Sequence, residues 1–392
     1  MVKFSEVENI AIEAEIKKLL IKKVIKPCNK EGGFISNIFT RPKKDGTKRM
    51  ILNLKKFNEN IEYKHFKMES LNSAIELVKK DCYMASVDLK DAFYSIPVST
   101  EHTDFLKFEH KGKFYKFVCM PMGYGPSMRI FTKVLKPIYA HLREKGLESV
   151  VFVDDNLLLG DTYSECRTNV LCTVSQIRKL GFTVHVDKSI FEPSQRITFL
   201  GFILDSSQMT ITLSLEKQES IKKLCLEIIS SPEITIRKLA CVIGKIVSSF
   251  PAVKYGKLHY RELELEKIDA LKNNQGDFDR KITLTREPIK ELKWWSTNIL
   301  IQYKSLIPQP FKRTIFCDAS KLGWGIHSNG VSNGARWMPN VALLHINELE
   351  LIAIYHGVRA FCNQDRNTHI KVMCDNATAV SHIKNMGGGQ KL

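Results

Sequence analysis

The chain has 392 residues, too many for one hydrophobic core, so the sequence predicts about two to four domains or subdomains. Lysine and arginine outnumber aspartate and glutamate by 59 to 42, and the net charge of +17 favours a polyanionic partner such as nucleic acid or an acidic membrane surface. The charged N-terminus lacks the apolar core of a signal peptide, and no apolar stretch approaches the roughly 20 residues that span a bilayer. We therefore expect an intracellular protein, cytoplasmic or nuclear or both, that is neither secreted nor inserted in a membrane.

The first half of the chain alternates helix and strand patterns. An amphipathic helix over residues 5–25 precedes two strands around a basic turn at Lys43–Gly46. The expected elements that follow are a short helix over 70–80, a strand over 83–98 that runs into a turn or short helix, a strand and Gly/Pro-rich loop over 113–127, a long helix over 128–146, and a tight hairpin over 150–160.

The second half is predicted to be more helical. We expect a helix over 163–180, strands over 182–187 and 196–204, and mainly helices over 214–300. Two prolines in "SLIPQPFKR" indicate a linker, after which a hairpin, a helix, and a strand leading into another helix are expected. The ten cysteines form no CxxC pair, so their spacing suggests neither a zinc site nor a thioredoxin-like motif.

Two adjacent acids, Asp154 and Asp155, interrupt an apolar run that would otherwise predict a buried strand. Burying two unpaired carboxylates side by side is unfavourable, because like charges repel at low dielectric. Asp88 also follows apolar residues at or near a strand end. A divalent cation between such strand ends would replace the repulsion by coordination, as Mg²⁺ does in phosphoryl transfer. Taken alone, each of the two motifs is better explained by a turn with solvated acids.

The combination is more specific, because six motifs occur in the order found in one enzyme family. The chain resembles the retroelement reverse transcriptases in its fingers motif and in motifs A to E, which read "RPKKDGTKRMILNLKKFN", "SVDLKDAFYSIPV", "MPMGYGPSMRIFTKVL", "FVDD", "LGFTVHVDKS" and "FLGF". The resemblance implies that Asp88 and Asp154 bridge two Mg²⁺ ions, with Mn²⁺ as a substitute, and that Asp155 adds negative charge and positioning. It also implies a DNA primer, an RNA template and dNTPs as partners.

The resemblance implies further roles in nucleotide and primer binding. Lys43 or Lys44 together with Arg49 would hold the incoming triphosphate, although a solvated basic hairpin is the alternative. Phe93 would exclude a 2′-hydroxyl, or serve as a core aromatic, or both. Met122 departs from the Phe or Gln of relatives, and Gly123 and Gly125 would allow close backbone approach, as any Gly-rich turn would. Lys188 would donate a proton to pyrophosphate, with an ordinary surface lysine as the alternative. The strand Phe199, Leu200 and Gly201 would form the primer grip, with a plain core strand as the alternative.

A second set of acids lies in the last part of the chain. Asp318 and Asp375 each follow an apolar run, and Glu350 lies on the helix between them. This segment resembles a ribonuclease H domain, whose carboxylates bind two Mg²⁺ and cut the RNA of an RNA–DNA hybrid. The family has a fourth acid downstream, whereas no acid follows Asp375, which predicts a fragment or truncated element. "HINELEL" and the "WW" pair resemble DIRS-type more than other retrotransposons, such as the LTR type.

The expected fold is α+β, a right-hand polymerase followed by a connection and a partial ribonuclease H-like α/β domain. The expected boundaries are fingers and palm over 1–205, thumb and connection over 206–310, and the ribonuclease H-like domain over 311–392. We expect an RNA-directed DNA polymerase. The alternatives are a degenerate or domesticated protein that binds nucleic acid without catalysis, and a protein with nuclease activity alone.

Overall fold

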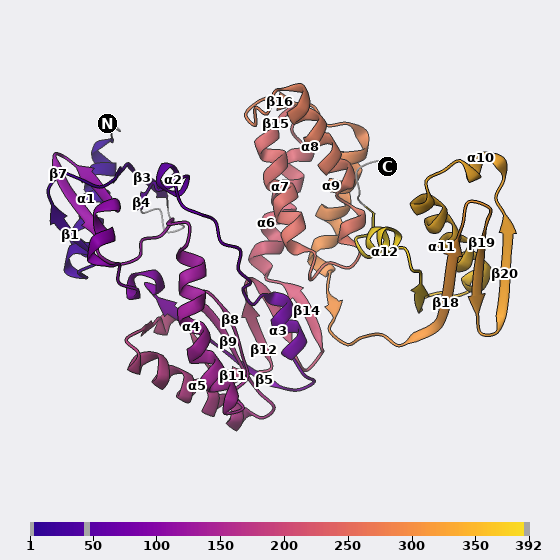
Figure 1. Cartoon of the computed structure of the whole chain (residues 1–392), viewed down its shortest axis with the longest axis horizontal. Coiled ribbons are helices and arrows are strands. Elements are labelled where there is room, and N and C mark those ends of the chain that lie inside the picture. The colour runs from indigo at the N-terminus through magenta and orange to yellow at the C-terminus, as the bar shows by residue number, and fades with distance from the viewer. Residues whose placement is uncertain (1–3, 43–47, 388–392) are drawn as a thin grey trace. The chain divides into compact units, whose positions relative to one another are not determined.

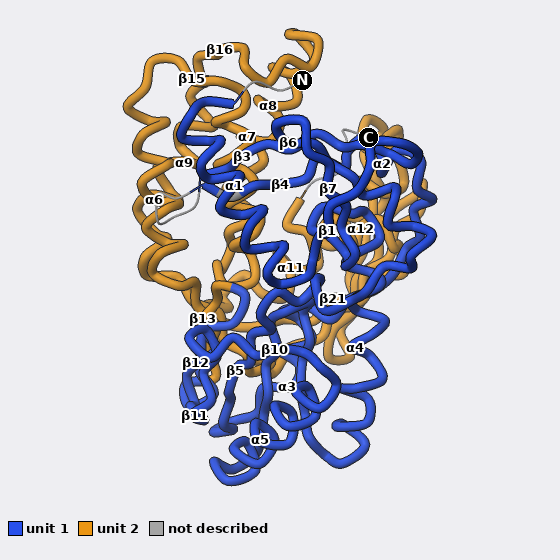
Figure 2. Tube along the Cα trace, turned by 90° about the vertical axis from the view of Figure 1, so that its left-hand side faces the viewer, with its two compact units in different colours: residues 1–200, 204–208 blue, residues 201–203, 209–392 orange. Residues whose placement is uncertain are grey.

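The computed structural model describes residues 4–42 and 48–387. The chain folds into two compact units, residues 1–200 with 204–208 and residues 201–203 with 209–392 (Figures 1 and 2). No helix in the described ranges is both long enough and apolar enough to cross a lipid bilayer.

The first unit contains a central sheet with the strand order β10-β5-β9-β8, in which β11 also pairs with β5. Its strands are β5 (Tyr83–Lys90), β8 (Ser149–Phe152), β9 (Asp155–Gly160), β10 (Thr183–Val184) and β11 (Ile190–Ser194). The long helices α4 (Ser127–Glu144) and α5 (Tyr163–Lys179) pack on it, and the shared core includes Phe131, Leu135, Leu158 and Ile177. The apolar runs predicted as strands are therefore buried under helices.

The first unit also contains a second core around helix α1 (Glu6–Ile21). A four-stranded sheet has the order β1-β7-β6-β2, and β3 pairs with β4 in a separate hairpin whose predicted basic turn lies outside the described residues. The remaining helices and strands of the first unit are β1 (Ile25–Cys28), β2 (Ile35–Ser36), β3 (Ile38–Pro42), β4 (Lys48–Leu52), α2 (Lys55–Asn58), α3 (Leu71–Leu77), η1 (Ala92–Ser95), η2 (Thr100–Phe105), β6 (Lys107–His110) and β7 (Lys113–Phe117).

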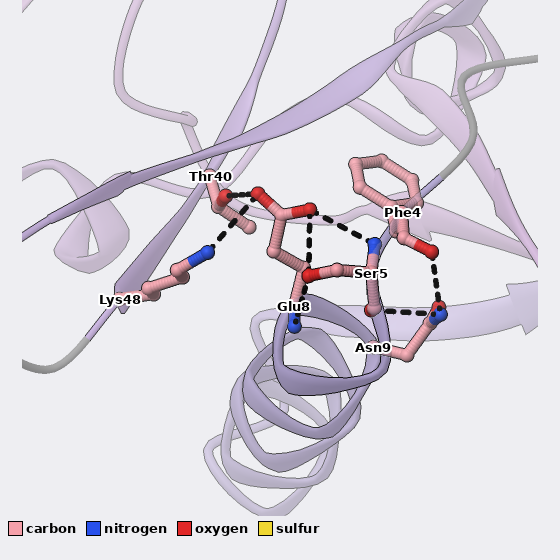
Figure 3. A network of polar contacts seen from close by, with 6 residues as sticks. All are labelled: Phe4, Ser5, Glu8, Asn9, Thr40 and Lys48. Atoms are coloured by element: carbon pink, nitrogen blue, oxygen red, sulfur yellow. Dashed lines mark hydrogen bonds and ion pairs between the residues drawn. The ribbon is translucent and has the colours of Figure 1, made fainter.

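The carboxylate of Glu8 joins helix α1 to both strands of the β3–β4 hairpin (Figure 3). Ser5 and Glu8 form a capping box at the start of the helix. The same carboxylate accepts a hydrogen bond of 2.7 Å from the hydroxyl of Thr40 and lies 3.2 Å from Lys48 Nζ. Hydrogen bonds from Ser5, Thr40 and Lys48 lower the pKa of Glu8 to about 2. Glu8 is therefore ionised at neutral pH and fixes the hairpin against α1.

The second unit begins with strands and continues with four long helices. Strand β13 (Phe202–Asp205), of which Phe202 and Ile203 belong to this unit, is followed in one sheet by β14 (Thr210–Leu213) and β17 (Lys304–Ser305). The helices pack as neighbours around apolar residues such as Trp295, and a short β15–β16 pair joins two of the connections. The bounds are α6 (Leu215–Ile229), β15 (Ile234–Thr235), α7 (Ile236–Ser249), η4 (Gly256–Leu258), α8 (Arg261–Asn273), β16 (Lys281–Ile282), α9 (Arg286–Asn298) and η5 (Ile299–Ile301).

The last part of the second unit is a sheet with the order β20-β19-β18-β21. Its strands β18 (Phe311–Ala319) and β21 (His369–Met373) are parallel, and the other neighbours are antiparallel. Helix α11 (Ile346–Cys362) packs on β18 and β19 (Gly323–Ser328) (Figure 1). Ile315, Ile326 and Ile354 belong to the core between them. The other elements are β20 (Val331–Arg336), α10 (Pro339–Ala342) and α12 (Ala377–Lys384).

Candidate active sites

Three acids of the first unit lie at one end of its central sheet. Strands β5 and β9 are antiparallel, and their register puts Asp88 directly opposite Asp155. Strand β8 turns into β9 through Val153 and Asp154 alone, because Phe152 pairs with Asp155. The expected tight hairpin is therefore present, and it brings Asp154 and Asp155 beside Asp88 across the sheet.

The hairpin turn has an unusual backbone conformation and is held by two hydrogen bonds that the sequence did not reveal. Val153 has a φ of +58°, which is unfavourable for a β-branched residue and is typical of functional turns. The carbonyl oxygen of Asp154 accepts hydrogen bonds from the Leu89 backbone N–H at 3.0 Å and from the Asn156 side chain at 3.1 Å. Asn156 is fully buried and also donates to the Val87 carbonyl at 2.8 Å. Asn156 thus fixes the turn that carries Asp154.

The electrostatics of this site leave a deficit of positive charge. Burial, together with repulsion from Asp154 and Asp88, raises the pKa of Asp155 to about 6. Burial also raises the pKa of Asp88, while the attraction of Lys188 opposes this shift. No described side chain forms an ion pair within 4.0 Å of any of the three acids. A divalent cation fits such a site, because coordination would offset both the desolvation and the mutual repulsion.

The loop before α4 is held by a residue to which the sequence assigned no role, Asn58 at the end of α2. Its side-chain nitrogen donates to the Gly123 carbonyl at 2.9 Å, and its side-chain oxygen accepts the Gly125 backbone N–H at 2.9 Å. Gly123 has a φ of +88°, a conformation that favours glycine. Met122 is 43% exposed beside this clamp. Only the tertiary structure reveals this contact, since Asn58 lies 65 residues before Gly123.

The predicted primer-grip strand is instead a turn between two strands, β12 (Arg196–Phe199) and β13. Leu200 and Gly201 have positive φ angles of 51° and 76°, as in the two central residues of a type I′ turn. The continuous apolar run hides this turn, because leucine rarely adopts positive φ. Phe199 is 3% exposed and packs inside, whereas Leu200 and Gly201 form the tip.

Lys43 and Lys44 lie outside the described residues, as does the side chain of Arg49, so their predicted triphosphate contacts stay predictions. Arg49 itself lies on β4, where its backbone pairs with Arg41. Lys188 is exposed at the end of η3 (Val186–Lys188), and the attraction of its charge opposes the rise in the pKa of Asp88 and of Asp155. Phe93 is half-buried on η1, against the core under β5.

The second group of acids also lies at strand ends. Asp318 is the penultimate residue of β18, Glu350 is on α11, and Asp375 is the second residue after β21. Glu350 is only 3% exposed, and burial raises its pKa, with further contributions from Asp318 and Asp375. Asp318 and Asp375 are exposed and line a cavity of about 630 Å³. The parallel pairing of β18 with β21 brings the two aspartates to the same edge of the sheet.

The two histidines near this group have structural contacts. His345 is the N-cap of α11, and its Nδ1 accepts the Asn347 backbone N–H at 3.2 Å. His356 stacks on Trp324, with ring centroids 4.7 Å apart. These contacts give both rings a structural role in holding the start of α11 and the packing against Trp324.

Comparison with known families decides how the first unit is classified. Residues 41–204 match the family model described as reverse transcriptase (RNA-dependent DNA polymerase). This part of the chain belongs to that family. The matched range contains Asp88, Asp154 and Asp155, together with the turn and loop described above. The prediction of a retroelement reverse transcriptase is confirmed.

Retroelement polyproteins also resemble the chain beyond this range. A putative enzymatic polyprotein of Cassava vein mosaic virus is 21% identical over 373 residues, which cover 90% of this chain and 53% of that protein. Polyprotein P3 of Commelina yellow mottle virus is 25% identical over 226 residues, or 55% of this chain and 11% of that protein. The Tf2-3 transposon polyprotein of Schizosaccharomyces pombe is 22% identical over 43% of this chain and 12% of its own length. The chain thus spans about half or less of these relatives.

Two solved structures share the fold over 95% of the chain. The foamy viral protease–reverse transcriptase dRH in complex with double-stranded DNA has a TM-score of 0.66 and 19% identity, with 63% of that chain covered. The foamy viral protease–reverse transcriptase in complex with an RNA/DNA hybrid has a TM-score of 0.65 and 19% identity, with 48% of that chain covered. The predicted α+β right-hand polymerase fold is confirmed.

Proposed function

We propose that the chain is an RNA-directed DNA polymerase that transfers a nucleotide from a dNTP to the 3′-hydroxyl of a DNA primer on an RNA template. The observation that carries this proposal is the arrangement of Asp88 opposite Asp155, with Asp154 on the adjoining turn, in the part of the chain that belongs to the reverse transcriptase family. The net charge of +17 supports binding to nucleic-acid phosphates.

Asp88 and Asp154 are the proposed ligands of two Mg²⁺ ions, for which Mn²⁺ is a substitute. Asp154 is exposed and Asp155 is half-buried, which supports direct binding by Asp154 and a charge and positioning role for Asp155. When bound, the ions lower the pKa of the primer 3′-hydroxyl and neutralise the charge that develops on pyrophosphate. Lys188, whose charge acts on Asp88 and Asp155, is the proposed proton donor to that leaving group.

The nucleotide pocket is proposed to combine the basic β3–β4 hairpin with the loop before α4. Lys43 or Lys44 and Arg49 hold the triphosphate, and Phe93 excludes the 2′-hydroxyl. Met122 and Gly123 form the surface beside the base pair, where Gly123 has no Cβ to obstruct it. Phe199, Leu200 and Gly201 are proposed as the primer grip, in which the contact is made by the turn rather than by the buried Phe199 ring.

A second candidate function, cleavage of RNA in an RNA–DNA hybrid, rests on Asp318, Glu350 and Asp375. Their gathering at one edge of the β18–β21 sheet supports a divalent-metal site for phosphodiester hydrolysis. We therefore propose three regions, with fingers and palm in residues 1–205, thumb and connection in 206–310, and a ribonuclease H-like domain in 311–392. The proposed partners are the RNA template, the DNA primer, their hybrid and dNTPs, in an intracellular setting.

Primer extension on an RNA template with dNTPs and Mg²⁺ tests the polymerase. We expect Asp154→Asn to lower the extension rate on the order of 10³-fold or more while primer–template binding is retained, because the change removes a metal ligand and keeps the size of the side chain. Asp155→Asn should cause a smaller loss, and Asp161→Asn, an exposed acid beyond the same hairpin, serves as the control. Wild-type protein that binds primer–template but adds no nucleotide would support the non-catalytic alternative. Cleavage of a labelled hybrid that is lost in Asp318→Asn would support the nuclease.

A further inference from the structure

Cys374 adds a thiol to the acids at the end of β21. Glu350, Cys374 and Asp375 each offer one ligand atom, and these three atoms all lie within 4.8 Å of one another. The Sγ atom of Cys374 is 3.6 Å from a carboxylate oxygen of Glu350. Within residues 4–42 and 48–387, no other group of three or more His, Cys, Asp or Glu side chains brings its ligand atoms this close together. Asp318 is not a member of the group.

The surrounding fold holds these three side chains in place. Asn376 caps α12 by accepting the Ala379 backbone N–H at 2.9 Å, and its side-chain nitrogen donates to the Asn347 side chain on α11 at 3.0 Å. This contact ties the segment after β21 to the helix that carries Glu350. The ligand atoms therefore come from two neighbouring parts of the fold that this hydrogen bond connects.

The ligand set suits a transition metal better than Mg²⁺. Zn²⁺ and its analogues bind thiolate sulfur at about 2.3 Å and carboxylate oxygen at about 2.0–2.2 Å, whereas Mg²⁺ prefers oxygen ligands. The buried Glu350 has no cation within 4.0 Å among the described side chains, and its side-chain hydrogen-bond partner there is the thiol of Cys374. The cavity of about 630 Å³ lined by Cys374 and Asp375 gives a metal and its remaining water ligand access.

We propose that Glu350, Cys374 and Asp375 form a binding site for Zn²⁺ or a similar thiophilic divalent metal. The site shares Glu350 and Asp375 with the proposed nuclease centre but uses Cys374 in place of Asp318, so a thiophilic metal excludes Mg²⁺ from that centre. On binding, the Cys374 thiol releases its proton to solvent, and the thiolate forms the metal–sulfur bond. The inference concerns metal binding and holds whether or not the nuclease is active.

Titration of the full-length protein with Co²⁺ or Cd²⁺ tests the site, because a metal–thiolate bond gives a charge-transfer absorption band. We expect a band that saturates at one metal per chain. Cys374→Ser should abolish it and weaken metal binding by about 100-fold or more, since changes outside the ligand shell alone cost 10–100-fold. Glu350→Gln should weaken binding similarly. Asp318→Asn should keep the band, and so should Cys362→Ser, which removes another partly buried thiol of the same region.

Three outcomes would overturn the proposal: no band at one metal per chain, a band unchanged in Cys374→Ser, or a band lost in Cys362→Ser. Cys374→Ala provides a second variant, and the near-ultraviolet circular dichroism of Trp324 and Trp337 checks that this region is folded. Hybrid cleavage in Mg²⁺ is measured separately. Failure of cleavage with an intact thiolate band would reject the nuclease alone, and cleavage without the band would reject the thiophilic site alone.

Discussion

Phe93 of η1 packs edge-on against Phe131 of α4, with ring centroids 5.4 Å apart and an interplanar angle of 67°. Phe131 is fully buried, so it offers a rigid surface that fixes the position of the half-buried Phe93 ring. A ring that discriminates by steric exclusion has to be held firmly, because a mobile ring would move aside. Both sequence-based interpretations of Phe93, as a core aromatic and as a barrier to ribonucleotides, are thus compatible.

Shortening this ring should relax sugar selection. We expect Phe93→Val to raise the kcat/KM for a ribonucleotide relative to its deoxynucleotide about 10- to 200-fold, the range in which small changes of pocket volume are discriminated. Phe93→Tyr keeps the ring and should keep the selectivity. Single-nucleotide incorporation with matched rNTP and dNTP measures the ratio. An unchanged ratio in Phe93→Val would assign Phe93 to packing alone.

The Asn58 clamp should affect nucleotide binding more than chemistry. Asn58→Ala removes both hydrogen bonds that hold Gly123 and Gly125, and we expect the KM for dNTP to rise about tenfold, consistent with roughly 0.5–1.5 kcal/mol for each lost bond, while kcat changes less. Asn60→Ala is the matched control, because the side chain of Asn60 donates to the nearby Lys56 carbonyl and not to the loop before α4. Equal effects of the two substitutions on KM, or a loss in kcat alone, would contradict the positioning role.

The sequence predicted features that depend on local pattern. Apolar runs beside acids predicted the strands of Asp88 and Asp155. The interruption of the apolar run at Asp154 and Asp155 predicted the hairpin. Both predictions depend on strand length and turn chemistry, which are local properties. Strand β20 was not predicted, since its residues are all exposed and show no alternation. Pairing with β19 alone makes it a strand. The β15–β16 pair is only two residues long on each side and leaves no pattern either.

Contacts between distant residues could not be predicted from one sequence. Asn156 and Asn58 are ordinary asparagines until the fold supplies the carbonyls that they bind. The sequence around Cys374 did not predict a metal site, because it contains no CxxC motif and Glu350 lies 24 residues away on another element. The turn at Leu200 was hidden for the opposite reason, since its local pattern favours a strand and only tertiary packing compensates for the unfavourable φ.

Tyr139 of α4 should be replaceable by phenylalanine with a gain in stability. The side chain is 1% exposed, and its hydroxyl has no hydrogen-bond partner among the described residues. Removing an unsatisfied buried hydroxyl relieves a desolvation cost, so we expect Tyr139→Phe to stabilise the first unit by about 1 kcal/mol. Tyr63→Phe, at a site 79% exposed, should change stability little.

Urea unfolding of these tyrosine variants is best followed by far-ultraviolet circular dichroism. The four tryptophans, at positions 294, 295, 324 and 337, all lie in the second unit, so their fluorescence would not report on α4. Destabilisation by Tyr139→Phe beyond about 0.5 kcal/mol would mean that the hydroxyl has a partner in solution, such as a bound water.

His110 of β6 should make the first unit less stable at mildly acidic pH. It is 7% exposed, its Nε2 has no hydrogen-bond partner among the described residues, and burial lowers its pKa below the usual 6.5 despite Glu13 at 3.8 Å. The folded protein therefore keeps this ring neutral where the unfolded chain is already protonated. The resulting stability is fully present above pH 6.5 and is lost as the pH falls through the lowered pKa of the folded state.

The measurable consequence is a pH dependence of the free energy of unfolding that comes from the His110 side chain. Between pH 6.5 and about 5, we expect the free energy of unfolding of the wild type to fall relative to His110→Asn by up to about 1.4 kcal/mol per pH unit, the limit for one proton. Using the difference between the two proteins removes the titration of carboxylates common to both. His102→Asn, a change at an exposed histidine of the same unit, should run parallel to the wild type. Parallel curves for the wild type and His110→Asn would show that His110 takes up its proton in the folded protein.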